Sequence, residues 1–539
     1  MTPKHLIWGI IAITSGVFAS QSLLSESKKP LSNFQGSITC TSTTVFEPKS
    51  YQEAAEIVQE ANLANRTVMV GAPRFASQLD AACADEDGVQ VTLKHLNRMI
   101  TVDTENKTAT VQAGMRFAEF SEAISKFGLA VNMVTELNSF TIGGMLGSGT
   151  HGSTYQKKGA MISDYVTSMK IIDGQGEVRT LTGDLLDAAR VNLGVLGIVV
   201  EVTIQLEDAF KVKAVQNAYA SDKGLEDKIL SYPRNNYSAS VAWFPGIGKY
   251  TTTIYEEVPF TSEGNAYNSQ AARSDTLFKS YSILTKLGQK SQHISCLAAE
   301  FRYQTRKAPF FAEAGKVIKS GAVGYSHRMQ YFGCDTRPKD GRACLWDNTP
   351  IKLEEIGIPM ERLPEAIADI RRIVAKKKTC FNLNGIYFRF AKASASYLGM
   401  PAGRDTAFVS IEFVLNKKGT AAPINYDVLQ EIEQMLLHRY EGRPHWGKNS
   451  IPVFLKAANK FPKWDNFLAA KKELDPNNTF SNKFWQRIIS EKITSEMERQ
   501  IYSEGCVDKD TCYCQKDLHC PNGKTCQSGL VYTEAKVCR

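Results

Sequence analysis

Thr141-Ile-Gly-Gly-Met-Leu-Gly-Ser-Gly-Thr-His-Gly152 is the most informative segment of this chain, because five of its twelve residues are glycine. Glycine has no Cβ, so the backbone can approach a flat or charged ligand closely. Successive backbone N–H groups in such a run can also form a concavity that binds phosphate. The segment therefore predicts a cofactor contact, and a plain glycine turn without a ligand is the alternative.

A nicotinamide-dinucleotide site is the first interpretation to test. Gly147, Gly149 and Gly152 satisfy G-x-G-x-x-G, and Asp173 follows 21 residues later. That fingerprint needs a buried strand before it and a helix at its third glycine. Here polar residues precede the run and residues 153–159 are polar and end in glycine, so the context argues against a Rossmann domain.

Length and composition limit the class of protein. A chain of 539 residues is too long for one core, which predicts two large domains with appendages. With 43% hydrophobic and 22% charged residues, its composition is that of a globular protein. The net charge of +8 is modest, and basic residues form only short clusters such as residues 376–378. We therefore expect no nucleic-acid binding.

The first twenty residues are typical of a secretory signal peptide. Lys4 and His5 precede an apolar stretch at 6–18, and small residues follow. A retained signal anchor is the alternative, but 13 residues are short for a bilayer span of about 20. We expect a secreted or lumenal glycoprotein with no stable membrane span. Four glycosylation sequons suit this prediction: Asn65, Asn106, Asn236 and Asn477.

The cysteines also indicate an oxidising compartment. Six of the twelve lie in the last 34 residues: Cys506, Cys512, Cys514, Cys520, Cys526 and Cys538. Their spacing fits no zinc-ligand pattern, so a small disulfide module is expected, with 15 possible pairings. The other six are Cys40, Cys83, Cys296, Cys334, Cys344 and Cys380, of which Cys334 and Cys344 could bridge one loop.

Apolar periodicity predicts mixed secondary structure throughout. In the first part we expect helices at 51–62 and 117–126, with strands at 68–70, 89–93, 100–102, 108–112, 166–172, 177–181 and 194–204. Further along, strands are expected at 250–255 and 407–414 and helices at 363–376 and 467–474. A linker helix should then reach about residue 502.

This order of elements resembles the FAD-binding domain of the vanillyl-alcohol oxidase and p-cresol methylhydroxylase family. His445-Trp-Gly-Lys448 and the late Leu474-Asp-Pro resemble the sugar-1,4-lactone oxidase branch, which includes L-gulonolactone, galactonolactone and D-arabinono-1,4-lactone oxidases, with alditol oxidase as a relative. The resemblance covers residues 40–490. It implies an α+β fold with a two-subdomain FAD-binding domain and an α/β substrate (cap) domain. The expected boundaries are a signal peptide at 1–20, a linker at 21–39, the FAD-binding domain at 40–207, the substrate domain at 208–490, a linker at 491–505 and the cysteine-rich module at 506–539.

The resemblance also implies which residues contact FAD. They are Gly71, Ala72, Pro73, Arg74, Phe75, Ala76, Ser77, Thr141, Gly143, Gly144, Gly147, Ser148, Gly149, His151, Gly152, Gly197, Ile198 and Lys448. Many members attach the flavin to a histidine in a Gly-x-x-x-His-Ser turn, and Ala76-Ser77 stands there in this chain. We therefore expect non-covalent FAD. His151 is expected to support its loop by hydrogen bonding, and a bulky residue at Gly149 to cost FAD before it costs the fold.

Lys448, His445, Arg389 and Tyr387 are the catalytic candidates that the resemblance implies. A lysine beside the N1–C2 edge of the flavin can stabilise negative charge, and a histidine can orient substrate hydroxyls. Without the flavin motifs, His445 and Lys448 would be interpreted as a surface loop, and Arg389 as part of an exposed strand face. Lactone oxidases typically show Glu-x-Arg where this chain has Tyr387-x-Arg389, so the expected carboxylate partner of the arginine is missing.

Two further residues are candidates for the site. Glu412 is a possible replacement acid for the missing glutamate. Thr141 matches a hydroxyl-bearing position that faces substrate in alditol oxidase.

The function implied is an FAD-dependent oxidoreductase that oxidises a CH–OH group of an aldono-1,4-lactone, an alditol or a related carbohydrate. Hydride passes to flavin N5, and O2 is the expected acceptor, giving H2O2; a dehydrogenase that uses another electron acceptor is the alternative. An oxidase of another small alcohol or secondary metabolite is the alternative within enzymes. A secreted, non-catalytic binding protein with a flavin fold is the alternative outside them. We expect no metal, and a cysteine-rich tail that binds an unknown partner.

Overall fold

The computed structural model describes residues 26–27, 31–33, 38–42, 44–71, 81–137, 139–268, 283–285, 287–288, 291–307, 311–318, 320–331, 351–381, 384–414, 424–489, 495–521 and 523–539. Several sequence predictions fall outside these ranges: the signal peptide, the turn at 72–77 that includes Ala76, and the Cys334–Cys344 pair.

A small sheet begins the described chain. Its strand order is β1 (Glu26–Ser27), β2 (Val45–Phe46), β4 (Val89–Val91) and β3 (Val68–Val70), and the last three are parallel. Helix α1 (Tyr51–Leu63) starts where the Ser50 side chain accepts a hydrogen bond from the Glu53 N–H. Its apolar face, predicted from the sequence, is buried against these strands.

A five-stranded antiparallel sheet forms the centre of the N-terminal half. Its strand order is β5 (Met99–Asp103), β6 (Thr108–Gln112), β10 (Ile198–Gln205), β8 (Val166–Ile172) and β9 (Val178–Leu181). An antiparallel sheet cannot be a Rossmann fold, whose strands are mostly parallel. The same half contains α2 (Phe117–Ser125), α3 (Ile142–Ser148), α4 (Gly183–Ala189) and the pair β7 (Leu129–Ala130) with β11 (Glu207–Asp208).

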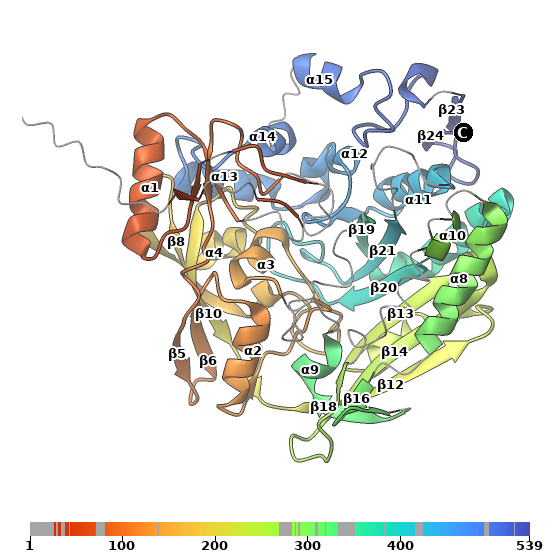
Figure 1. Cartoon of the computed structure of the whole chain (residues 1–539), viewed down its shortest axis with the longest axis horizontal. Coiled ribbons are helices and arrows are strands. Elements are labelled where there is room, and N and C mark those ends of the chain that lie inside the picture. Colours follow the sequence, from red (N-terminus) through yellow and green to blue (C-terminus); the bar gives the residue numbers. More distant parts are fainter. Residues whose placement is uncertain are drawn as a thin grey trace, which may run out of the picture.

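The second half is built on an eight-stranded sheet (Figure 1). Its order is β18 (Ala322–Tyr325), β12 (Lys211–Tyr219), β14 (Lys249–Val258), β13 (Ser238–Phe244), β20 (Ile386–Ala391), β21 (Thr406–Val414), β19 (Ile351–Pro359) and β22 (Arg443–Pro444). On β20, the buried Ile386, Phe388 and Phe390 share a core with helices α10 (Leu363–Lys377) and α11 (Tyr426–His438).

The opposite face of this sheet is polar near its centre. Since successive strand residues point to opposite faces, Tyr387 and Arg389 on β20 lie on the face away from that core. On β13, Ala242 and Phe244 point to this second face and pack against helix α8 (Gln292–Lys307). One sheet thus has an apolar core on one side and a polar wall on the other.

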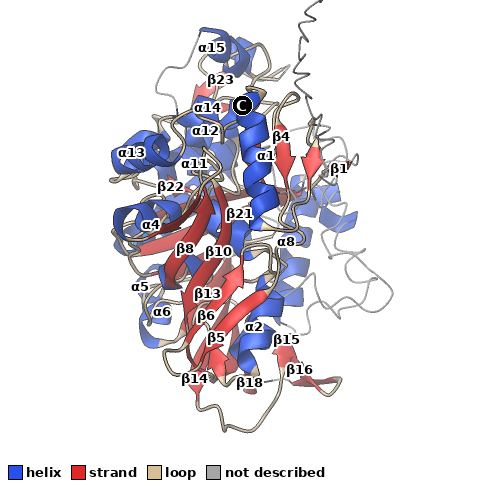
Figure 2. Ribbon diagram, turned by 90° about the vertical axis from the view of Figure 1, so that its left-hand side faces the viewer, coloured by secondary structure: helices blue, strands red, loops and turns tan. Residues whose placement is uncertain are grey.

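The C-terminal helices return to the first half. The core of the N-terminal half includes buried aromatic residues from α12 (Ile451–Phe454), α13 (Trp464–Leu474) and α14 (Lys483–Ile489). Figures 1 and 2 show α13 beside α4, which it contacts. The two halves follow one another in the sequence, and helices from the end of the second half pack into the core of the first.

Disulfides connect distant segments of the described chain. Cys40 is bonded to Cys83 and Cys296 to Cys380. The pairing of the C-terminal module, left open by the sequence, is Cys506–Cys512, Cys514–Cys526 and Cys520–Cys538. The module contains β23 (Cys526–Ser528) and β24 (Lys536–Cys538), follows α15 (Ser495–Ile501) and packs on α11.

The remaining described elements are α5 (Leu225–Lys228), α6 (Ser231–Asn235), β15 (Tyr267–Asn268), β16 (Phe311–Glu313), β17 (Lys316–Ile318) and α9 (Ser326–Gln330). Among the described residues, none of the helices is both long and apolar enough to span a bilayer.

The glycine run is more regular than the sequence indicated. We expected an open loop, but Thr141 caps α3, and the segment from Ile142 to Ser148 is helical. The cap is a hydrogen bond from the Gly144 N–H to Thr141 Oγ1 at 3.2 Å. Gly149 then ends the helix in the left-handed conformation (φ 67°), which glycine adopts without strain.

Candidate active site

A cavity of about 980 Å³ runs between the two halves of the protein. This volume lies at the upper end of the range for ligand pockets, about 300–1,000 Å³, so it has room for a cofactor and a small substrate. One wall comes from the N-terminal half, including α3 and the segment before it. The other comes from the polar face of the eight-stranded sheet and from residues 445–448.

The N-terminal wall is rich in glycine. Six of the glycines that line it are Gly71, Gly143, Gly144, Gly147, Gly194 and Gly197. A Cβ built on Gly147 meets only Asn192 Oδ1, at 3.9 Å, so the space beside this residue is open. Ser139 Oγ, in the same wall, is buried without a hydrogen-bond partner in the described part of the chain. A bare wall with an unsatisfied polar atom fits a large ligand that has flat and polar parts.

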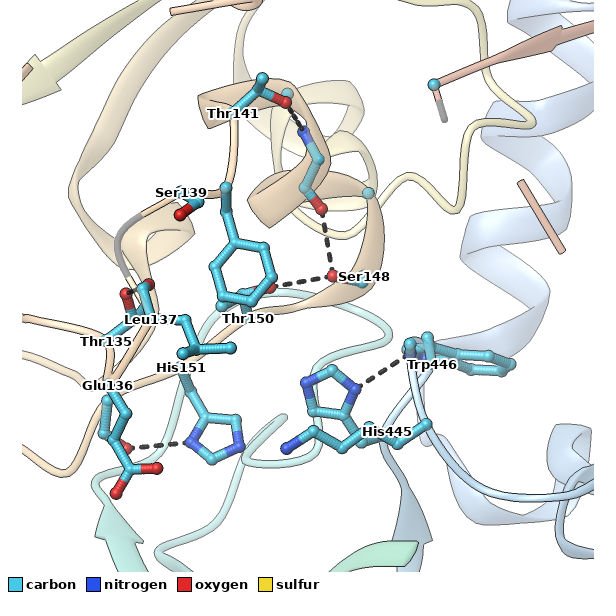
Figure 3. Close-up of a pocket in the computed structure, with 18 of the residues that line it drawn as sticks. Thr135, Glu136, Leu137, Ser139, Thr141, Ser148, Thr150, His151, His445 and Trp446 are labelled. Atoms are coloured by element: carbon cyan, nitrogen blue, oxygen red, sulfur yellow. Dashed lines mark hydrogen bonds between the residues drawn. The ribbon is translucent and has the colours of Figure 1, made fainter. Parts of the chain in front are cut away.

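Hydroxyl groups join α3 to the segment that follows it (Figure 3). Ser148 Oγ donates to the Gly144 carbonyl at 3.0 Å and lies 2.9 Å from Thr150 Oγ1. His151 follows directly, and Figure 3 shows His151 and His445 facing the same space. The helix end is therefore tied to the residues at the base of the cavity.

Glu355 on β19 is the centre of the base. Its side chain is fully buried, and its Oε1 accepts hydrogen bonds from His151 Nε2 at 2.8 Å and Lys448 Nζ at 2.9 Å. Its Oε2 accepts from Arg389 Nη2 at 2.5 Å. The Ser410 hydroxyl on β21 donates to the same oxygen. We call Glu355, Arg389, Lys448 and His151 the base cluster.

Charge pairing in the base cluster fixes its ionisation. Although burial acts to raise it, the nearby Lys448 and Arg389 hold the pKa of Glu355 well below its usual range. Burial lowers the pKa of Lys448, and Glu355 opposes this effect. Glu355 and Glu136 raise the pKa of Arg389 against the effect of burial. The cluster therefore presents an ionised carboxylate bonded to two cationic groups.

The two histidines are held in less basic states. Burial lowers the pKa of His151, and burial with the nearby Lys448 lowers the pKa of His445 well below its usual value. His445 Nδ1 accepts a hydrogen bond from the Gly447 N–H at 3.0 Å, which leaves its proton on Nε2. His445 can thus donate from Nε2 toward a bound oxygen.

The His445–Lys448 segment has a separate structural anchor. Trp446 is buried and stacks on Phe461, with ring centroids 5.3 Å apart, and on Phe454 at 5.4 Å. Its Nε1 donates to the Leu398 carbonyl at 2.7 Å. Trp446 therefore holds His445 and Lys448 in place from behind, which explains the tryptophan between them.

A metal ion is disfavoured at this site. Ligand atoms of His151, Glu355 and His445 lie within 4.8 Å of one another. However, the Lys448 ammonium and the Arg389 guanidinium already bind the Glu355 carboxylate, and they would repel a cation.

Tyr387 and Glu412 occupy the wall beyond the base cluster. Burial raises the pKa of Tyr387, whose hydroxyl donates to Ser240 Oγ at 2.9 Å. Glu412 is placed on the same wall, where burial raises its pKa. The sequence suggested that Arg389 lacks a carboxylate partner, and the structure corrects this: Glu355 supplies it from β19, two strands away from β20.

Most predicted site residues line the cavity. They are Gly71, Thr141, Gly143, Gly144, Gly147, Ser148, His151, Gly152, Gly197, Tyr387, Arg389, His445 and Lys448. Gly149 and Ile198 do not line it: Gly149 caps α3, and Ile198 is a fully buried core residue that begins β10. The predicted contacts at 72–77 lie outside the described residues. His151 Nδ1 lies 2.9 Å from the carbonyl oxygen of Gly152.

Sequence reasoning missed Glu355, Glu136, Arg302 and Arg306, which also line the cavity. A signal for Glu355 was present, since Glu354 and Glu355 are consecutive acids in a strand whose other residues, apart from Lys352, are apolar. Buried acids of this kind are rare unless they are paired.

The fold and this cavity define a flavin-dependent oxidoreductase. Residues 42–182 match the family described as an FAD binding domain. Residues 202–488, more than half of the chain, match D-arabinono-1,4-lactone oxidase, and residues 503–539 match the C-terminal domain of L-gulonolactone oxidase 2-like proteins. The chain therefore belongs to the D-arabinono-1,4-lactone oxidase family, and its cofactor is FAD.

Individual relatives agree with this assignment. L-gulonolactone oxidase 2 of Arabidopsis thaliana is 29% identical over 93% of this chain and 89% of its own length. Probable L-gulonolactone oxidase 6 of the same plant is 30% identical over 93% of this chain and 87% of its own length. The L-gulonolactone oxidase of Bos taurus is 23% identical over 85% of this chain and 97% of its own length.

Solved structures show the same fold. A solvent-stable cholesterol oxidase covers 87% of this chain and 98% of its own, with a TM-score of 0.69 and 16% identity. Cholesterol oxidase from B. sterolicum matches with a TM-score of 0.67 and 14% identity, and it also covers 87% of this chain and 98% of its own.

Proposed function

We propose that the protein oxidises a secondary alcohol of an aldono-1,4-lactone, with L-gulono-1,4-lactone as the first substrate to test and O2 as the electron acceptor. The base cluster carries this proposal, because two cations paired to one buried carboxylate lie at the cavity surface beside a glycine-lined wall. The names of the relatives support the lactone as substrate class.

The residues of the base cluster would bind and polarise the substrate. Arg389 and Lys448 would hold the oxygen of the reacting carbinol and stabilise the negative charge that grows as its proton leaves. Glu355 would keep both cations in position, since a rigid carboxylate between them fixes their geometry. His445 would donate from Nε2 to a neighbouring substrate oxygen.

Bound FAD supplies the hydride acceptor in this chemistry. In the overall reaction the substrate CH–OH becomes C=O, and both of its hydrogens, with their two electrons, end on O2 as H2O2. No further co-reactant is needed.

The decisive experiment is a substrate panel with the purified, FAD-loaded protein. Under anaerobic conditions L-gulono-1,4-lactone should bleach the yellow colour, and admission of air should restore it and produce H2O2. Bleaching by an unrelated alcohol alone would favour the alternative small-alcohol oxidase. A protein that stays yellow with lactones, alditols and alcohols would be a binding protein instead. Bleaching that air does not reverse would contradict O2 as the acceptor.

We also propose that the chain is exported to an oxidising compartment and glycosylated. Support comes from the disulfides and from the exposed positions of three sequon asparagines, Asn65, Asn106 and Asn477. Expression of the full chain in a eukaryotic host tests this. Export should place it in the medium, where removal of N-glycans lowers its mass; retention in the cytosol with reduced thiols would contradict the proposal.

A further inference from the structure

Arg306, near the end of α8, points its guanidinium toward the cavity without a charged partner. It lines the cavity wall, and its Nε is buried with no hydrogen-bond partner in the described segments. No aspartate or glutamate among the described residues lies within ion-pairing distance of Arg306. A guanidinium in this situation is costly unless a ligand provides the anion.

Among the described residues, the Arg306 guanidinium makes its side-chain contact with an aromatic ring. Its guanidinium lies over the ring of Tyr387, 5.3 Å from the centroid. Tyr387 offers a ring face there instead of a carboxylate, and its hydroxyl is already bonded to Ser240. Arg389, by contrast, donates to Glu355 at 2.5 Å. Of these two guanidinium groups, that of Arg389 is paired with a carboxylate and that of Arg306 is not.

The two arginines lie on the same ring. Arg389 is 5.9 Å and Arg306 is 5.3 Å from the Tyr387 centroid, so their guanidinium carbons are at most about 11 Å apart. A single sugar-sized molecule can contact both. If Arg389 and Lys448 hold the reacting end, Arg306 meets the other end of the same substrate.

Glu136 and Glu412 act on the Arg306 charge from beyond ion-pairing distance, where they raise its pKa against the effects of burial and of Arg302. Glu412 accepts a hydrogen bond from Asn384 Nδ2 at 3.2 Å, and Glu136 lies 3.9 Å from Arg389 Nη1. Ser240 and Thr253 add hydroxyl groups to the same wall. This combination of hydroxyls and a cation matches a polyhydroxylated acid better than a neutral polyol.

We propose that the substrate is an acidic sugar lactone, with a carboxylate at the end remote from the oxidised carbon, and that Arg306 binds this carboxylate. The inference rests on the proposed function for the reaction itself. It adds a substrate class and a specificity-determining residue.

Two lactones that differ at one carbon test the inference. L-gulono-1,4-lactone ends in CH2OH, and D-glucaro-6,3-lactone has the same ring with a carboxylate at that carbon. The wild-type enzyme should oxidise the acid with a kcat/KM at least 10-fold higher. Arg306→Gln should reduce kcat/KM for the acid 10- to 100-fold and leave the neutral lactone within about 2-fold, as expected for loss of one charge-assisted hydrogen bond.

Controls separate charge recognition from folding. Lys307→Gln removes an exposed cation from the adjacent position of α8 and should leave kcat/KM unchanged for both lactones. Arg306→Lys keeps the charge without the planar fork and should retain part of the preference. If Arg306→Gln does not fold, Arg306→Lys tests the inference, because its preference for the acidic lactone should lie between that of the wild type and none.

Binding without turnover gives an independent readout. Calorimetric titration with D-glucarate, the open-chain diacid, should show binding to the wild type that Arg306→Gln loses. Equal or better use of the neutral lactone by the wild type, with glucarate binding unchanged in Arg306→Gln, would overturn the inference and leave the proposed function intact. Failure to oxidise either lactone would count against the proposed function, and the glucarate titration would still decide the role of Arg306.

Discussion

Lys448 is the residue whose loss should separate catalysis from folding. Its side chain is 23% exposed, whereas the Glu355 carboxylate that it contacts is fully buried and keeps Arg389 and His151 as partners. Lys448→Met should therefore lower kcat about 100- to 1,000-fold, the usual cost of removing one donor to a developing oxyanion.

The test is to measure steady-state kcat for Lys448→Met and the wild type, together with the FAD content and melting temperature of each. Lys126→Met, at an exposed position after α2, is the matched control and should retain full activity. A Lys448→Met enzyme with kcat within 3-fold of wild type would show that this ammonium does not act on the substrate.

Ala76 predicts how the cofactor is retained. Its methyl side chain cannot form the bond that a histidine makes in covalent members of the family. We expect acid precipitation of the yellow protein to release FAD quantitatively into the supernatant. Colour that remains in the washed pellet would demonstrate a covalent attachment at another residue.

Individual residues could be identified from sequence only where a motif fixed their neighbours. His445 and Lys448 were found because Trp-Gly separates them, and the structure places both in the cavity. Glu355 was missed because its role depends on strand pairing: β19 lies beside β21, which brings Glu355 next to Ser410, and β21 pairs with β20. Pairing of strands from distant segments is set by tertiary packing and cannot be inferred from alternation alone.

At the scale of elements, substitutions at Gly147 and Gly149, at the end of α3, should have different effects. The space beside Gly147 is open, so the side chain in Gly147→Val would occupy cavity volume without a clash. We expect this variant to lose most of its FAD while its apoprotein melts close to the wild type. Gly149 instead has φ 67°, so Gly149→Ala should keep FAD and destabilise the fold by about 1 kcal/mol.

The two predictions can be checked by measuring the absorbance ratio for bound flavin in each variant and the thermal unfolding of each apoprotein. Reversal of the two phenotypes, with FAD lost in Gly149→Ala and kept in Gly147→Val, would contradict this placement of the helix. The sequence prediction had assigned the FAD effect to Gly149.

Most elements were predictable, and the exceptions have physical causes. The periodic helices α1, α2, α10 and α13 end within a few residues of their predicted limits. The glycine run was expected to be a loop, and glycine does disfavour helix by about 1 kcal/mol per residue. In the protein, the Thr141 cap and burial of Ile142, Met145 and Leu146 overcome that cost.

At the scale of the whole molecule, the base cluster and His445 make stability depend on pH. Buried His151 and His445 have lowered pKa values, so the unfolded chain binds their protons first as pH falls. Their effect is absent above the unfolded pKa of about 6.5, and stability falls below it by up to about 1.4 kcal/mol per pH unit for each histidine. Glu355 acts in the same direction at lower pH, because its folded pKa is depressed below an unfolded value of about 4.3.

Melting temperatures between pH 7.5 and pH 5 measure this effect. The wild type should lose stability steadily below pH 6.5, and His445→Asn should show a smaller slope because one proton-binding site is gone. A melting temperature that is flat over this interval would contradict the lowered pKa values of His151 and His445.

Strand β19 has a consequence for how the protein can be divided. While Glu355 faces the cavity, Lys352 is buried on the same strand and its Nζ contacts Tyr426 Oη at 2.6 Å and Asp510 Oδ1, in the cysteine-rich module, at 2.7 Å. The module also donates to the buried Glu431 through the Val531 and Tyr532 N–H groups. A chain truncated before Cys506 would leave this ammonium and carboxylate short of partners inside the protein. The unit that can be expressed as an intact enzyme therefore extends to the last residues, beyond the segment that carries out the chemistry.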